Sequence, residues 1–177
     1  MDLIEVQFRP ERGDDIAKIA EITSAAFGQA DESHLVERIR ASTFFVPDLS
    51  IVAELAGLAI AHVLLSRIWF RDRNGYLSDV LALAPVSVAP EYQGRGIGSK
   101  LIEHALLRAT ELGYASIILL GHPNYYPRFG FVPSDRFKIA LPPFVTDQSA
   151  FMIKVLDPAR SPSDGAIIYT PAFDDVC

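Results

Sequence analysis

The sequence predicts a mixed α/β fold, with one central sheet of about six or seven strands and helices on both of its faces. Three observations lead to this prediction. Half of the 177 residues are hydrophobic and 21% are charged, which is ordinary globular composition. Short apolar runs rich in β-branched residues alternate with segments of helical periodicity. A strongly amphipathic segment also lies between two apolar runs, and this order favours a helix that crosses between two parallel strands.

The first part of the chain contains one strand pattern followed by two helix patterns. Apolar and polar residues alternate over residues 4–8, and Pro10 ends this run, so a first strand is expected here. Apolar residues recur at helical spacing over residues 16–27, directly after the Asp14-Asp15 pair, which can cap a helix start. A second, shorter helix is expected over residues 32–41.

The middle of the chain predicts three strands. Residues 51–55 and 58–68 are apolar runs separated by Ala56-Gly57, which is typical of an antiparallel hairpin in which Gly57 takes a positive φ. Residues 77–88 form the third run, and Pro85 interrupts it. Because proline cannot donate a hydrogen bond to a neighbouring strand, Pro85 indicates a bulge or a place where strand pairing opens.

Residues 97–112 give the strongest helix pattern in the sequence. Its apolar stripe consists of Ile97, Leu101, Ala105, Ala109 and Leu112, and Gly113 supplies a stop signal. Residues 115–120 are a short, fully apolar run, which predicts a strand buried on both faces. A short helix is then expected, followed by strands over residues 138–141, 151–155 and 166–169 between proline-rich loops.

Charge and cysteine content exclude some classes of function. The formal net charge is −6 with no basic stripe, which argues against a nucleic-acid partner and suits a cationic acceptor better. The only cysteine is Cys177, so no internal disulfide can form. The four histidines have no metal-ligand spacing, so no metal is expected. No signal-peptide pattern is visible, and the apolar stretch over residues 51–65 is too short to span a bilayer, so a cytoplasmic location without membrane attachment is expected.

The most informative segment is a glycine loop between the strand that contains Pro85 and the long helix. Gly94, Gly96 and Gly98 are spaced two apart, and the loop opens directly into the helix. Exposed N–H groups at a helix N-terminus bind anions, and glycines let a phosphate approach the backbone closely. Arg95 adds positive charge at the same place. The alternative is that the glycines serve only to make a tight strand-to-helix turn.

Two common phosphate-binding motifs fail when the loop is compared residue by residue. A dinucleotide fingerprint that starts at Gly94 would need glycine where Ser99 stands, and one that starts at Gly96 would need glycine where Leu101 stands. A Walker-type loop needs glycine directly before lysine and then serine or threonine, whereas the order here is Gly98-Ser99-Lys100. Neither a dinucleotide nor a Walker-type nucleotide site is expected.

A third pattern fits. Gln93-x-x-Gly96-x-Gly98, between an interrupted strand and a long helix, resembles the coenzyme-A-binding motif of the GNAT N-acetyltransferase superfamily. The later segment Tyr125-Tyr126-Pro127-Arg128-Phe129-Gly130-Phe131 resembles a second motif of that family, in which an aromatic pair is followed by Gly-Phe. The likeness extends from the first strand to about Val155. The segment over residues 165–173 is similar to the end of a bacterial branch whose members are predicted acetyltransferases.

The resemblance implies a GNAT-like sheet that is V-shaped, splayed after Pro85, with acetyl-CoA in the splay. It implies that the pyrophosphate and pantetheine contact Val86, Val88, Gln93, Gly94, Arg95, Gly96, Ile97, Gly98, Ser99 and Tyr126. The residues themselves agree, because a bulge at Pro85 would leave backbone groups near Val86 and Val88 free to pair with a ligand. It further implies one acyltransferase domain over residues 1–177, with residues 156–177 as an extension packed on the sheet, and a homodimer.

The resemblance also implies catalytic roles. A free amide near Val88 would stabilise the oxyanion, and Tyr126, four residues before Gly130, matches the general-acid tyrosine of the family. The alternative is that Tyr125 and Tyr126 are packing aromatics, and Tyr126 would be displaced unless Pro127 lies in the first turn of a helix. Glu54, His62, Asp79 and His122 are the candidate bases. His122 ranks above His62, because it follows a buried strand at its carboxyl end, where ligands gather in open α/β sheets.

These features predict transfer of an acetyl group from acetyl-CoA to a primary amine of a small molecule or peptide, by direct attack in a ternary complex. The alternative function is a non-catalytic acyl-CoA-binding sensor or interaction module. The acceptor pocket is expected between the first two helices, the turn over residues 68–76 and the loop over residues 141–150. Five aromatic residues could line this pocket or belong to the core: Phe44, Phe45, Trp69, Phe70 and Phe144.

Overall fold

A computed structural model describes residues 6–174 of the chain. The expected strand residue Ile4 and the terminal Cys177 lie outside the described residues. The strands are β1 (Gln7–Pro10), β2 (Ser50–Leu55), β3 (Leu58–Asp72), β4 (Leu77–Val88), β5 (Ser116–Leu120), β6 (Val132–Pro133), β7 (Ile139–Ala140), β8 (Phe151–Val155) and β9 (Gly165–Ile168). The longer helices are α1 (Ile16–Phe27), α2 (Asp31–Arg40) and α3 (Ile97–Glu111).

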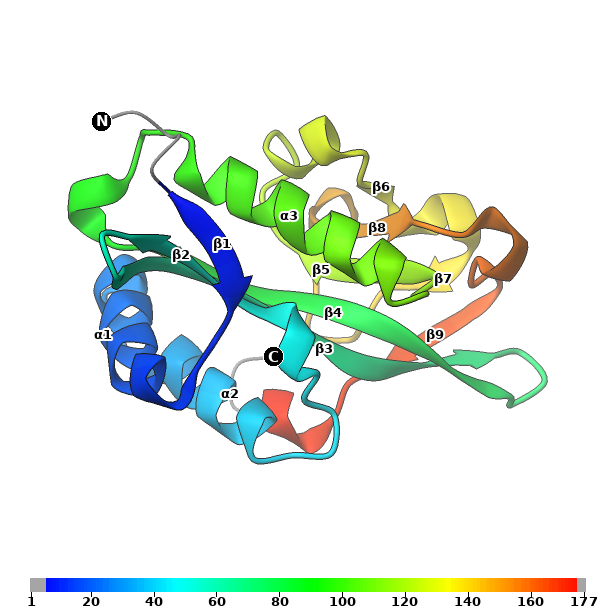
Figure 1. Cartoon of the computed structure of the whole chain (residues 1–177). Coiled ribbons are helices and arrows are strands. Elements are labelled where there is room, and N and C mark those ends of the chain that lie inside the picture. The colour runs from blue at the N-terminus through cyan, green and yellow to red at the C-terminus, as the bar shows by residue number, and fades with distance from the viewer. Residues whose placement is uncertain (1–5, 175–177) are drawn as a thin grey trace.

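The described strands form one mixed sheet, as the sequence predicts (Figure 1). Its main path runs β1-β2-β3-β4-β5-β8-β6. Only β4 and β5 are parallel on this path, and α3 makes the crossover between them. The second half of β3 also pairs with β9, and β9 pairs with the short β7. The C-terminal segment therefore extends the sheet beside β3.

Helices cover both faces of the sheet. Helix α3 packs on one face through Leu101, Ile102, Ala105 and Ala109, and α1 and α2 pack on the other face. The apolar residues of α1 and α2 that reach this second core are Ile19, Ile22, Leu35, Val36 and Ile39. Burial of such side chains stabilises the fold by about 1.5–3 kcal/mol each. The amphipathic patterns over these three helices are confirmed.

The hairpin between β2 and β3 turns at Ala56 and Gly57, which have φ values of 49° and 82°. Two successive positive φ values are the signature of a type I′ turn, whose twist matches that of the flanking strands. The short helix expected after β5 is instead one turn of 3-10 helix over Tyr126–Phe129.

The parallel pairing of β4 with β5 is brief, and this opens the sheet. Leu81 pairs with Ile117 and Ala82 with Ile118, after which β4 continues to Val88 without pairing with β5. Ala84 and Pro85 together lie opposite the single residue Leu64 of β3, because the register shifts there. The bulge expected at Pro85 is present between β3 and β4. Strands β4 and β5 stop pairing a few residues before it, after Ala82.

Candidate functional site

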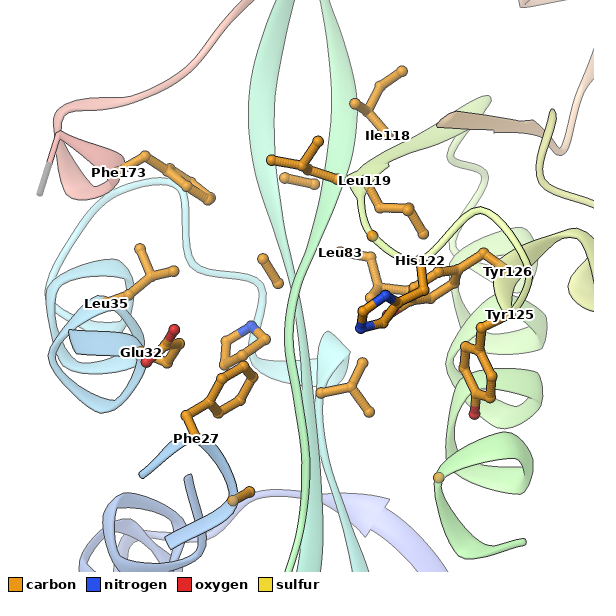
Figure 2. Close-up of a pocket in the computed structure, with 18 of the residues that line it drawn as sticks. Phe27, Glu32, Leu35, Leu83, Ile118, Leu119, His122, Tyr125, Tyr126 and Phe173 are labelled. Atoms are coloured by element: carbon orange, nitrogen blue, oxygen red, sulfur yellow. The ribbon is translucent and has the colours of Figure 1, made fainter. Parts of the chain in front are cut away.

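A cavity of about 720 Å³ lies where β4 and β5 separate (Figure 2). Its residues come from both hydrophobic cores of the molecule. Those from the α3 side are Leu83, Val86, Val88, Leu119, Tyr125 and Tyr126. Those from the α1 and α2 side are Leu35, Ala82, Ala84, Ile118, Tyr169 and Phe173. The cavity therefore lies between the two cores, at the place where the sheet opens.

The backbone of β4 directs open hydrogen-bonding groups into this cavity. The N–H of Ala89 donates to the carbonyl of Ile60 on β3 at 2.9 Å. Because successive residues of a strand point their backbone groups to opposite sides, those of Val88 and Val86 point away from β3, towards the gap. The side chain of Ser87 projects to the α1 face, where its Oγ lies 3.1 Å from the Oγ1 of Thr23. An extended ligand can pair with Val86 and Val88 as a strand would.

The glycine loop follows directly and has the conformation that its glycines allow. Gly94 and Gly96 have φ values of 72° and 80°, in the left-handed region that disfavours residues with a Cβ. Gly96 is the residue that immediately precedes α3. The loop therefore turns twice with positive φ before the helix begins, and its amides point outward at the helix N-terminus.

Most amides of the loop and of the first turn of α3 have no acceptor within the part of the chain that the structure describes. The first amide bonded back along the helix is that of Lys100, which donates to the carbonyl of Gly96 at 3.1 Å. The preceding N–H groups without a described protein acceptor are those of Gly94, Gly96, Ile97, Gly98 and Ser99. An N-terminal cluster of unpaired amides is an anion site, because the helix dipole adds to the hydrogen bonds.

Gln93 and Ile97 serve the loop in different ways. The Nε2 of Gln93 donates to the carbonyl of Val88 at 2.9 Å, which ties the loop to the end of β4. The side chain of Ile97 is buried in the core under α3, so only its backbone faces the loop. Arg95 is exposed, and its guanidinium lies 5.6 Å from the ring centroid of Tyr92. The sequence places Gln93 and Arg95 in the loop and Ile97 at the start of the helix, but it does not show which side chain faces the core and which faces solvent.

Two adjacent tyrosines follow β5 and make different contacts. The Oη of Tyr125 lies 3.2 Å from the Oγ of Ser99, in the first turn of α3. The ring of Tyr126 packs edge-on against Tyr125 and Phe131, with centroid distances of 5.2 and 5.8 Å. A Cβ at Gly121 would overlap the Tyr126 ring, so glycine is required there for the ring to occupy this place. Both tyrosines line the cavity.

Pro127 does not displace Tyr126. The 3-10 turn begins at Tyr126, and Pro127 occupies its first turn, where a missing N–H costs nothing. Burial, together with the neighbouring Tyr125, raises the pKa of Tyr126 to about 12. Its phenol is thus neutral, and a proton donor, throughout the physiological range.

The four candidate bases lie in different places, and only His122 lines the cavity. Glu54 forms an ion pair with Arg9 at 2.6 Å on the β1–β2 side of the sheet. His62 is fully buried, with its Nε2 2.8 Å from the Oγ of Ser50, and burial lowers its pKa to about 4. Asp79 is exposed on β4, away from the cavity. His122 follows β5 and projects into the cavity (Figure 2).

The wall on the α1 and α2 side contains residues that sequence reasoning missed. Glu32, Tyr169 and Phe173 line it with Phe144, the one member of the expected aromatic set that does so. Phe44 and Trp69 instead pack edge-to-face on each other, with centroids 6.0 Å apart. Periodicity could place Glu32 at the start of a helix, but no local pattern brings residues 169–173 beside it.

The folded chain matches the acetyltransferase (GNAT) family model over residues 16–131. The chain belongs to the GNAT family. This match spans α1 to β5, the glycine loop and the tyrosine pair, and of the residues that line the cavity only Phe144, Tyr169 and Phe173 lie beyond it. Among the described residues no helix has the length and apolarity to cross a membrane.

Relatives support this membership. The chain is 37% identical to the uncharacterized N-acetyltransferase YjhQ of Escherichia coli (strain K12) over 120 residues, which is 67% of this chain and 65% of that protein. It is 31% identical to the uncharacterized N-acetyltransferase YhbS of the same strain over 106 residues, which is 60% of this chain and 61% of that protein. The matches thus span less than two thirds of the length of either curated relative.

Solved structures match nearly the whole chain. A GNAT family acetyltransferase from Brucella melitensis, in complex with acetyl-CoA, has a TM-score of 0.77 and 31% identity, covering 96% of this chain and 98% of that one. The YhbS structure from Escherichia coli, in complex with CoA, has a TM-score of 0.86 and 27% identity, covering 98% and 94%. The splayed α/β sheet predicted from the sequence is confirmed.

Proposed function

We propose that the protein transfers an acetyl group from acetyl-CoA to a primary amine by direct attack in a ternary complex. The observation that carries this proposal is a continuous set of open backbone groups. It runs from the backbone groups of Val86 and the N–H of Val88 on β4 to the amides of Gly94 and residues 96–99, beside the cavity where β4 and β5 separate. A separate ligand would approach from each face of the sheet. This geometry suits a reaction between two bound substrates.

The loop and β4 would hold the cofactor. The amides of residues 94–99 would bind the pyrophosphate, with Arg95 adding charge at the rim, and the pantetheine would pair with Val86 and Val88. Gly98 lies next to this part of β4, since a Cβ there would contact the Cγ2 of Val88 at 3.4 Å. The acetyl-CoA and CoA bound to the two similar solved structures support this choice of cofactor.

The N–H of Val88 would stabilise the oxyanion. Attack by the amine nitrogen on the thioester carbon forms a C–N bond and places negative charge on the carbonyl oxygen. An amide held in place before the reaction stabilises that charge, and loss of one such donor commonly costs about 3 kcal/mol in the barrier. The bond from Gln93 to the Val88 carbonyl fixes the orientation of this part of the strand.

Tyr126 would assist the leaving group. When the C–S bond breaks, the sulfur carries the electron pair and needs a proton, which the neutral phenol of Tyr126 can donate. The burial that raises the pKa of Tyr126 also disfavours a thiolate in the same cavity, so the sulfur becomes a better proton acceptor there. The phenol then recovers its proton from water or from the released amine proton.

The amine must lose a proton to attack. A lysine-like amine with a pKa of about 10.4 is mostly charged at pH 7. Removal of its proton at this pH costs roughly 4–5 kcal/mol, which adds to the barrier for attack. Of the four bases considered, His122 is the one that faces the cavity, so it is our candidate to accept this proton directly or through water.

A broad acceptor screen that measures free thiol release tests the proposal. The purified chain, acetyl-CoA and a panel of primary amines should give acceptor-dependent CoA release together with N-acetylated product detected by mass spectrometry. Binding of acetyl-CoA without turnover on any small-molecule or peptide amine would contradict catalysis. That outcome would favour the alternative function, a non-catalytic acyl-CoA sensor.

A further inference from the structure

The wall of the cavity on the α1 and α2 side is mainly apolar and aromatic, and it carries one carboxylate. Phe27, Leu35, Phe144, Tyr169 and Phe173 supply most of its surface. Phe27 and Phe144 remain 43% and 42% exposed, although both are large aromatic side chains. Such exposure inside a cavity leaves apolar surface available to a ligand.

Glu32 is the only carboxylate among the residues that line this cavity. Figure 2 shows it beside Phe27 and Leu35, on the opposite side of the central strands from His122 and Tyr126. Its carboxylate accepts hydrogen bonds from the Nε2 of Gln29, at 3.2 Å to each oxygen, and no cation pairs with it among the described residues. A partly exposed carboxylate on the wall of a cavity attracts a cation that enters it, and apolar neighbours strengthen this attraction.

The position of Glu32 in the first turn of α2 does not by itself explain this arrangement. Carboxylates in that turn interact favourably with the helix dipole, and Asp31 occupies the same turn. Asp31 is exposed and does not line the cavity, whereas Glu32 does. Substitutions of Asp31 and Glu32 can therefore be compared to distinguish an effect of the helix dipole from an effect of the cavity.

We infer that the acceptor is an amine with an apolar or aromatic body and no carboxylate, and that Glu32 recognises its positive charge. This inference rests on the proposed function and assigns a substrate class to it. The body of the amine would pack on Phe27, Leu35 and Phe173. Its ammonium, which predominates in solution, would be drawn to Glu32 and to the faces of the nearby rings before the neutral form reacts. An amino acid would bring its own carboxylate beside Glu32 and be repelled.

The test compares three classes of amine in the steady state. Phenethylamine and hexylamine represent the expected class, glucosamine represents a polar body, and phenylalanine adds a carboxylate to the phenethyl body. The first class should give the highest kcat/KM. Glu32→Gln should raise the KM for phenethylamine about tenfold, the effect of losing about 1.4 kcal/mol of binding, and leave the KM for acetyl-CoA unchanged. Glu32→Lys should narrow the preference for phenethylamine over phenylalanine.

Asp31→Asn is the matched control, because it removes a carboxylate from the same helical turn outside the cavity. An equal KM for phenethylamine in both variants would overturn the role of Glu32 while leaving acetyl transfer intact. A preference for glucosamine or phenylalanine would overturn the substrate class.

Calorimetry of the same amines on the CoA-saturated protein gives a readout without turnover. Binding that depends on Glu32 but yields no product would keep the role of Glu32 in amine recognition and reject catalysis. Absence of binding and of turnover for all four amines would reject the inference.

Discussion

At the scale of the residue, the two adjacent tyrosines show how neighbours in sequence acquire different surroundings. Tyr125 contacts the first turn of α3 through Ser99, and the guanidinium of Arg128 lies 4.5 Å from its ring centroid. The ring of Tyr126 packs against Gly121, Phe129 and Phe131. The first contact positions the glycine loop, and the second holds a neutral phenol in apolar surroundings.

Replacement of Tyr126 by phenylalanine tests its role as the proton donor. The ring packing persists in Tyr126→Phe, so the KM for acetyl-CoA should change little, whereas kcat should fall by about 100-fold or more because a general acid is lost. Steady-state kinetics with a saturating amine measure this. Tyr125→Phe serves as the control for a lost hydroxyl, and full turnover by Tyr126→Phe would remove the acid assignment.

At the scale of the element, the central unit is a strand that loses its partner and a helix that begins with unpaired amides. The glycine loop joins the two and depends on backbone conformations that other residues adopt at a cost. Gly96 and Gly113 precede and follow α3, and both have a positive φ, of 80° and 81°. A Cβ would meet no atom within 4 Å at Gly113, so this position measures backbone strain alone.

Gly96→Ala should therefore affect stability and cofactor binding, whereas Gly113→Ala should affect stability alone. Each change places alanine in the left-handed region, at a cost of about 1 kcal/mol in the free energy of unfolding. Relief of that strain in Gly96→Ala would turn the amides of the loop, and the Kd for CoA should rise about tenfold or more. Thermal unfolding and calorimetry with CoA measure the two effects. Equal CoA affinity in the two variants would contradict the anion site.

Elements that are long enough to show a repeating apolar pattern could be predicted from the sequence, whereas very short elements could not. The stripe of α3 repeats over four turns and the hairpin carries its own turn signal, so both were placed correctly from the sequence. Strand β6 has only two residues, too few for an alternating pattern to be visible. The same distinction holds for the site. The glycine loop is one continuous segment, so its motif could be found in the sequence. The wall of the cavity on the α1 and α2 side contains Glu32 and Phe173, which lie far apart in the sequence. Their proximity depends on how the C-terminal segment packs against α2, which no local pattern predicts.

At the scale of the whole molecule, a buried polar cluster links distant parts of the chain. Glu11 accepts hydrogen bonds from Arg40 at 2.6 Å and from the hydroxyl of Ser50 at 2.5 Å, and His62 lies 2.8 Å from that hydroxyl. The cluster ties the segment after β1 and the end of α2 to strands β2 and β3. Burial alone would raise the pKa of Glu11, but the hydrogen bonds from Arg40 and Ser50 outweigh it and lower that pKa.

Global stability should decrease as the pH falls from about 6.5 to about 4, because of His62. Burial outweighs the attraction of Glu11 and lowers the pKa of His62 from 6.5 to about 4. Over this range the unfolded chain therefore binds a proton that the folded chain does not. The resulting loss in the free energy of unfolding reaches about 3 kcal/mol at pH 4. The lowered pKa of Glu11 adds a loss mainly below pH 4.5.

Urea unfolding at pH 4.5 and pH 7 measures this effect. His62→Gln should reduce the stability difference between the two pH values, because glutamine cannot gain the proton. His104→Gln, at a partly buried position of α3 where the ring stacks on Phe8, should retain the difference. Equal pH dependence in all three proteins would show that His62 is not the group responsible.

The central claim is that backbone groups of β4 and of the loop before α3 hold an acyl-CoA thioester in the gap of the sheet. Amide hydrogen exchange, measured with and without acetyl-CoA, tests it most directly, because it reads these N–H groups one by one. Exchange at Val86, Val88 and residues 94–99 should slow on addition of acetyl-CoA, with little change at Gly113. Unchanged exchange at these amides with millimolar acetyl-CoA, or protection confined to another part of the chain, would contradict the account.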